Sequence, residues 1–167
     1  MAIGDIKIVE PEKLSTENWQ VQDRTSSSDT VIYPGEPVKQ AADGSPYVIH
    51  LATGDPEIGT DIFVGIAASQ STETATADGS VEVYKLQEGM VLRGKATTAG
   101  NVDTAAKINA LRGDCVTFDL TSTTYTIDED EGNDNNVHGL IIMGGDPDKG
   151  TLDVRVKMGV RLEGVAL

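Results

Sequence analysis

The amino-acid sequence predicts an all-β protein, and three observations carry that prediction. Short segments rich in β-branched and aromatic residues recur between turns along most of the chain. The segment 151–162 alternates apolar and charged residues, as a half-buried antiparallel strand does. Only 101–113 carries apolar residues at helical spacing, and three such residues cannot build a helical core. We therefore expect one short helix on a β domain.

The stretch 61–96 is expected to form three central strands, at 62–67, 81–86 and 90–96. The tight connection between the last two predicts a hairpin. Between the first two lies 69–79, a loop of Ser, Thr, Ala and Asp that we expect to run over the surface, because it has little to bury.

Further strands are expected on both sides of this centre. The segment 31–38 is predicted to be an edge strand, because Pro37 cannot donate to a ladder and is confined to an edge strand or to the start of a strand. The other segments with strand composition are 47–51, 115–119, 122–127, 137–143 and 151–162. The last two are expected to pair as a hairpin across 144–150. The side chains expected on the core face of the final strand are Leu152, Val154, Val156, Met158, Val160 and Leu162.

Two local patterns concern turns and caps. The tetrapeptide Ala-Asp-Gly-Ser occurs at 42–45 and again at 77–80. We interpret it as turn chemistry used twice, with Asp-Gly supplying a positive φ, and not as a duplicated module. In the helix, Asp103 is the expected N-cap and Gly113 the terminating residue.

The first thirty residues read as an N-terminal arm in front of a domain at 31–167. Their apolar residues are sparse, and they end in a serine-rich run. Trp19 is the informative residue of this arm. It has two interpretations, packing on its own domain or anchoring the arm on a partner.

Composition limits the class of protein and its partners. The chain has 167 residues, enough for one domain with a real core. Its 27 acidic and 13 basic residues give a net charge of -14, which disfavours nucleic-acid and anionic-membrane partners. Cys115 is the single cysteine, so the chain has no intrachain disulfide. No apolar run approaches a membrane span and no signal peptide is evident, so we expect synthesis in the cytoplasm.

The sequence offers little that predicts catalysis. Composition allows a pair between Cys115 and either His50 or His138, but no surrounding motif supports one. The segment 145–151 resembles a phosphate-binding loop, yet Lys149 precedes the second glycine and a strand follows. We therefore expect a protein that is not an enzyme and has no cofactor.

The acidic loop 128–136 is the best candidate for a metal site. Asp128, Asp130 and Asp134 offer the oxygen ligands that calcium prefers, but Gly132 occupies a ligand position of the EF-hand pattern. We favour a solvated loop and predict no metal site. A structural calcium at a subunit contact is the alternative.

One succession of glycine-punctuated strands resembles a known family. It comprises Gly-Glu-Pro-Val at 35–38, Gly-Ile-Ala at 65–67, Asp-Gly-Ser-Val-Glu-Val at 78–83 and Gly-Met-Val at 89–91. In these features the chain is similar to small head decoration or cement proteins of tailed bacteriophages, some of which carry a DUF2190-like β domain. The similarity covers roughly 31–126.

The resemblance implies a small β-barrel or β-tulip-like domain and a structural role in the virion. Such proteins, often trimers, sit on the outer capsid surface at three-fold positions. They bridge major capsid protein subunits and stabilise the shell. The implied partners are therefore the major capsid protein and further copies of the chain.

An alternative function is a carbohydrate-binding or adhesin-type β module of a virion, although seven aromatic residues give little material for a sugar-stacking platform. The expected partner-binding residues are Trp19 and, from a locally basic window that also holds Lys107 and Arg112, Lys85, Arg93 and Lys95.

Overall fold

The computed structural model describes residues 6–9, 14–24, 31–87, 89–122, 124–157, 160 and 162, and it confirms the all-β prediction. One sheet contains β2 (Thr16–Val21), β3 (Pro37–Gln40), β4 (Val48–His50), β5 (Phe63–Ala67) and β6 (Gly79–Lys85). The other contains β1 (Lys7–Ile8), β7 (Val91–Lys95), β8 (Cys115–Thr121), β9 (Thr124–Asp128), β10 (Leu140–Asp146) and β11 (Thr151–Val156). A 3-10 turn, η2 (Ala99–Asn101), and the helix α1 (Ala105–Leu111) connect β7 to β8.

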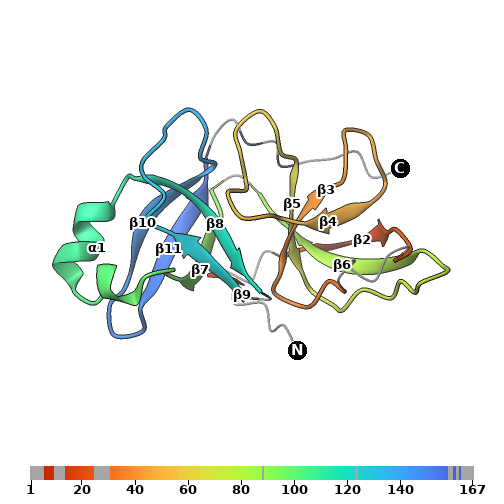
Figure 1. Ribbon diagram of the computed structural model, residues 1–167, viewed down its shortest axis with the longest axis horizontal. Coiled ribbons are helices and arrows are strands. Elements are labelled where there is room, and N and C mark those ends of the chain that lie inside the picture. The colour runs from red at the N-terminus through yellow and green to blue at the C-terminus, as the bar shows by residue number, and fades with distance from the viewer. Residues whose placement is uncertain are drawn as a thin grey trace.

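The two sheets form two lobes that lie side by side (Figure 1). In the first, the strand order β2-β6-β5-β3-β4 is curled so that a parallel bridge between Gln20 and Tyr47 joins its two edges. In the second, β7-β11-β10-β8-β9 is joined in the same way by a parallel bridge between Ala96 and Ile127. We call these lobes barrel 1 and barrel 2.

Both barrels have one topology. When β2 to β6 are matched in chain order with β7 to β11, every neighbouring pair of barrel 1 has a counterpart in barrel 2, and all of these pairs are antiparallel. The closing bridges are parallel in both barrels and join matched strands. The domain is thus a structural duplication, which the sequence did not reveal. The two Ala-Asp-Gly-Ser copies do not mark it, because one lies between β3 and β4 and the other leads into β6.

Strand β5 is the wall between two hydrophobic clusters. Val64 and Ala67 face the interior of barrel 1, together with residues such as Trp19. Phe63 and Ile66 face a larger cluster that fills barrel 2. Since one strand contributes to both clusters, the barrels share buried surface and neither can be removed without exposing the other.

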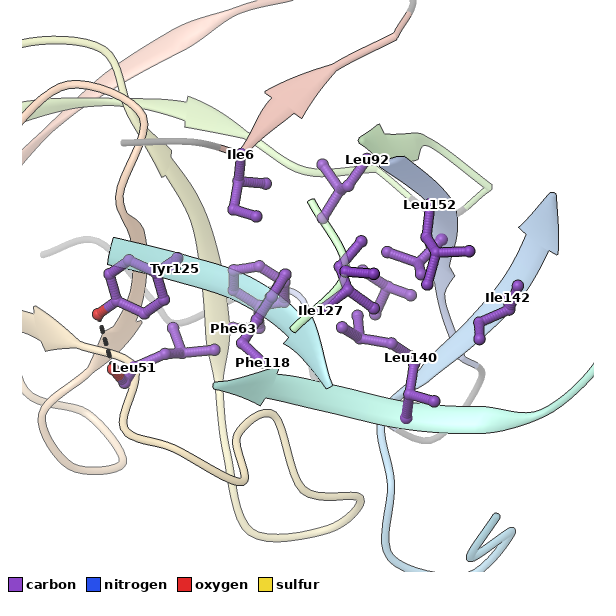
Figure 2. Packing of buried hydrophobic residues seen from close by; sticks show 14 of the residues in the cluster. Ile6, Leu51, Phe63, Leu92, Phe118, Tyr125, Ile127, Leu140, Ile142 and Leu152 are labelled. Atoms are coloured by element: carbon purple, nitrogen blue, oxygen red, sulfur yellow. Dashed lines mark hydrogen bonds between the residues drawn. The ribbon is translucent and has the colours of Figure 1, made fainter. Parts of the chain in front are cut away.

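Aromatic residues join the lobes within the larger cluster (Figure 2). The ring of Phe118 packs edge-on against Phe63 and Tyr125, with centroid distances of 6.1 and 6.5 Å. Such pairs contribute about 0.5–1.5 kcal/mol each beyond their buried area. The buried Tyr125 hydroxyl donates to the carbonyl oxygen of Leu51 at 2.7 Å, and burial raises the pKa of this tyrosine.

The connection 51–62 between β4 and β5 fastens barrel 1 to barrel 2. The Phe118 amide donates to the Asp55 carbonyl oxygen at 2.7 Å, and the Gly139 amide donates to the Pro56 carbonyl oxygen at 2.8 Å. Glu57 and His138 form an antiparallel bridge. The matching connection of barrel 2, between β9 and β10, contributes His138 and Gly139, so matched loops of the two barrels contact each other.

A buried charge cluster holds this connection in place. The Lys39 ammonium lies 2.6 Å from an oxygen of Asp55 and 2.8 Å from one of Asp61. Each carboxylate also accepts a backbone amide, from Ala52 and Glu57 respectively. Burial raises the pKa of Asp55. For Asp61 burial acts in the same direction, but hydrogen bonds from Lys39 and the Glu57 amide leave its pKa lowered.

Replacing Lys39 by Met should lower the free energy of unfolding at neutral pH by roughly 2–4 kcal/mol, because two buried carboxylates lose their cation. Without that cation, burial disfavours both ionised forms, so protonation should favour the folded state. The deficit relative to wild type should therefore shrink as pH falls from about 7 to about 4. Denaturant titrations of both proteins at several pH values measure this difference in the free energy of unfolding. Lys149→Met, at an exposed ion pair, is the control and should change stability by less than about 0.5 kcal/mol. A pH-independent deficit would contradict the assignment.

The described part of residues 1–30 belongs to the domain, which corrects the expected arm. Residues 16–21 form β2, which pairs with β6 along its whole length. Trp19 is 4% exposed in the core of barrel 1, and Ile6 is 2% exposed in the larger cluster. Few apolar residues suffice here, because a strand that joins an existing sheet gains its hydrogen bonds from its neighbour. Residues 1–5, 10–13 and 25–30 lie outside the described part.

Replacing Trp19 by Ala should lower the free energy of unfolding by about 3–5 kcal/mol, as for other buried tryptophans. Asn18→Ala is the matched control, because Asn18 lies on the exposed face of the same strand and should change stability by about 0.5 kcal/mol or less. Chemical denaturation compares the two. Equal stability of both variants would show that β2 does not contribute to the core.

Further expectations need correction. The expected edge strand at 31–38 is instead β3, which begins at Pro37 and lies between β5 and β4. The predicted hairpin between 81–86 and 90–96 does not form, because β6 and β7 belong to different sheets and 86–90 crosses between the barrels. The helix cap is Thr104, whose hydroxyl accepts the Lys107 amide, while Asp103 forms an ion pair with the Lys107 side chain instead.

The loop 69–79 is only partly a surface loop. Ser71 and Glu73 are buried, and the backbone at Thr72 and Glu73 occupies the space that a side chain at position 79 would need. Gly79 is therefore required by close approach and not by a positive φ, whereas Gly44 in the other tetrapeptide copy does have a positive φ of 76°.

The terminal hairpin is confirmed between β10 and β11, with Leu152, Val154 and Val156 buried on one face. The strand ends at Val156. Val160 is buried beyond it, and Met158 lies outside the described residues.

Candidate interaction surface

The residues expected to bind a partner lie apart in the structure. Trp19 is buried in barrel 1, as its first interpretation expects. Lys85 ends β6 of the same barrel and pairs with Glu17 at 3.2 Å. Arg93 and Lys95 lie on β7 of barrel 2, where Lys95 is exposed. The basic window is therefore divided between two sheets.

Much of the positive charge in that window is already paired. Arg93 donates twice to the Asp153 carboxylate, at 2.6 and 2.8 Å, and this carboxylate raises the pKa of the guanidinium. Lys107 pairs with Asp103 at 2.8 Å. The sequence window counted Arg93 without its partner, because Asp153 is distant along the chain. A partner role for Lys85, Arg93 and Lys95 stays a prediction.

Cys115 contacts one histidine, His138, but through its main-chain oxygen and not through its thiol. The Nδ1 atom of His138 lies 3.0 Å from the main-chain oxygen of Cys115. The buried thiol contacts the Asn135 side-chain oxygen at 3.0 Å, and the Lys157 ammonium lies 3.3 Å from the sulfur. The other histidine, His50, lies 3.3 Å from a carboxylate oxygen of Glu36 in barrel 1. The contacts around Cys115 thus tie the acidic loop to β8 and to Lys157, directly after β11.

The carboxylates of the acidic loop bind protein donors. Glu129 accepts the amides of Thr97 and Thr98 at 2.9 Å each, and the Asn101 side chain bridges Glu129 and Asp130. Two of the candidate metal ligands accept backbone amides of their own loop. Asp128 accepts the amide of Asp130, and Asp134 accepts the amide of Asn136. Burial, followed by the charges of Glu131 and Asp119, raises the pKa of Asp128. In the described part of the chain, no three acidic, histidine or cysteine side chains converge as a metal site.

An apolar groove of about 380 Å³ lies where the barrels meet on the side of β1. Its lining includes Ile6 and Ile8 from the segment of β1, and Pro34, Ile66 and Tyr84 from barrel 1. Val9, directly beyond β1, is one of the large apolar side chains that are more than a third exposed.

The outer face of β2 and β6 is polar and exposed. Thr16, Asn18 and Gln20 point outward on β2, and Glu82 lies opposite Asn18 on β6. Directly before β6, the Asp78 carboxylate accepts the Tyr47 hydroxyl and the Asp23 amide at 2.8 Å each. No sequence motif marks this face.

Comparison with known proteins gives no match, neither to a protein-family model nor to a curated protein. Among the described residues, no helix is long and apolar enough to cross a membrane.

Proposed function

We propose that the protein is a capsid decoration or cement protein, which binds the outer surface of a phage head and bridges neighbouring major capsid protein subunits. The observation that supports this most is the duplicated barrel. A bridging protein must contact two copies of the same lattice subunit, and two barrels of one topology present matched strands and loops to such neighbours.

The junction between the barrels suits a load-bearing role. A bridge stabilises a shell only if its two contact regions cannot move apart freely. Here β5 contributes to both clusters, and the rings of Phe63, Phe118 and Tyr125 pack across the junction. The Lys39 cluster adds charged hydrogen bonds at the same place. Force on one barrel would therefore be transmitted to the other.

The carbohydrate-binding alternative has less support. Sugar platforms need exposed aromatic faces, but Trp19, Phe63, Phe118 and Tyr125 are at most 4% exposed. The remaining aromatic residues, Tyr33, Tyr47 and Tyr84, are half-buried and belong to separate segments of barrel 1.

The test is addition of the purified protein to DNA-free phage heads that lack it, followed by sedimentation and by calorimetry of the particles. We expect saturable binding and a higher temperature of shell disruption, because the bound protein stabilises the assembled state by mass action. Bovine serum albumin at equal concentration is the control for trapping in the pellet. Heads that neither retain the protein nor gain stability would refute the proposal.

We further propose that the protein is a trimer, as the family resemblance implies. Light scattering coupled to size exclusion should give three times the chain mass at micromolar concentration. Since a three-fold site needs three equivalent copies, a stable monomer or dimer would exclude the trimer while leaving head binding to be judged by sedimentation.

A further inference from the structure

Among the residues that the structure describes, none pairs with the outer edge of the first half of β2. The Ser15 carbonyl oxygen accepts the Lys85 amide at 3.0 Å, so the peptide groups of Ser15, Glu17 and Trp19 face β6. By the alternation of an antiparallel ladder, those of Thr16 and Asn18 face away from it. Within the described ranges, β2 is bridged on this outer side only at its end, where Gln20 meets Tyr47.

Barrel 2 shows what fits such an edge. Its matched strand, β7, is also closed near its end, by the bridge between Ala96 and Ile127. The first half of β7 is not open, however, because the chain's own β1 pairs with it. Lys7 lies opposite Arg93, and the Val9 amide donates to the Val91 carbonyl oxygen at 2.9 Å. The two barrels share one topology, but at this edge described residues fill the position in barrel 2 and leave it unfilled in barrel 1.

The side chains around the open edge indicate the charge of its occupant. Glu17 lies on β2 itself and keeps 38% of its side chain exposed while pairing with Lys85. Glu82 lies opposite Asn18 and is exposed. An added strand would lie next to Glu17 on β2, and Glu82 on β6 would lie one strand farther away, across Asn18. A lysine or arginine would meet opposite charge there, whereas an acidic residue would meet repulsion.

We infer that the first half of β2 binds an extended segment of the partner protein that carries lysine or arginine and adds to barrel 1 as an antiparallel strand. The occupied edge of β7 supports the antiparallel direction, because β1 runs antiparallel to β7. Main-chain hydrogen bonds at Thr16 and Asn18 supply the contact, as in other cases of strand addition. This inference rests on the proposed function, in which the partner is the major capsid protein.

The first experiment removes one donor from the edge. Asn18→Pro deletes an amide that faces away from β6, so the β2–β6 ladder keeps its hydrogen bonds and the fold should persist. Binding to DNA-free heads should fall about tenfold or more, which corresponds to the loss of one well-formed contact plus the steric effect of the ring. Asn18→Ala keeps the amide and is the matched control, expected within about twofold of wild type.

The second experiment tests charge. Glu17→Gln and Glu82→Gln together should weaken head binding at low salt and flatten its dependence on salt, since they remove the carboxylates of the two strands nearest the added one. Asp148→Asn, an exposed carboxylate in the turn between β10 and β11, is the matched control and should leave both unchanged.

Amide hydrogen exchange of the wild-type protein decides the matter independently of whether Asn18→Pro folds. The amides of Thr16 and Asn18 should exchange rapidly in the free protein and become protected on heads. If wild type binds heads while these amides stay unprotected, or while folded Asn18→Pro binds equally well, the inference fails and the proposed function stands. If wild type does not bind heads, both fail. Protection that rises with protein concentration without heads would identify a second copy as the occupant and overturn the inference.

Discussion

The packing of two barrels against a shared strand is the constraint on which the rest of this structure depends. Strand β5 has both faces buried, whereas a strand of a sheet with one solvated face buries only one. The connection 51–62 that leads into it carries the Asp55 and Asp61 carboxylates, and Lys39 pairs with both. Buried charges are costly unless they are paired, so this cluster specifies one arrangement of the junction more than it adds stability. The orientation of one barrel fixes that of the other.

Strand composition and alternation were sufficient to predict most strands, because both are local properties. The strand 151–156 is the clearest case, since Leu152, Val154 and Val156 alternate with polar residues and lie buried on one face. What could not be predicted was which sheet each strand joins. Residues 81–96 fit a hairpin locally, yet Leu86 turns into the larger cluster and the chain crosses to the second barrel. Pairing depends on distant partners, and a short connection allows either outcome.

The candidate site was predicted less well than the fold, for a related reason. Arg93 and Trp19 were selected as unusual residues in their local sequence, but each has a partner far along the chain, Asp153 for the guanidinium and the barrel 1 core for the indole. Charge counted in a window cannot distinguish a paired cation from a free one. Similarly, the Cys115 and His138 contact arises because the acidic loop folds back on β8, although their hydrogen bond uses a carbonyl oxygen and not the thiol.

Recognition through an open strand edge would account for the absence of a motif. Peptide groups are the same in every residue, so an edge that binds by its backbone leaves a trace in the sequence only through what it avoids, such as proline at positions 16 and 18. The duplication makes such an edge visible in the structure, because the occupied position beside β7 can be compared with the open one beside β2. If the partner binds as proposed, the two halves share a topology and specificity would come from the edge at which they differ, with Glu17 on the edge strand and Glu82 one strand behind it.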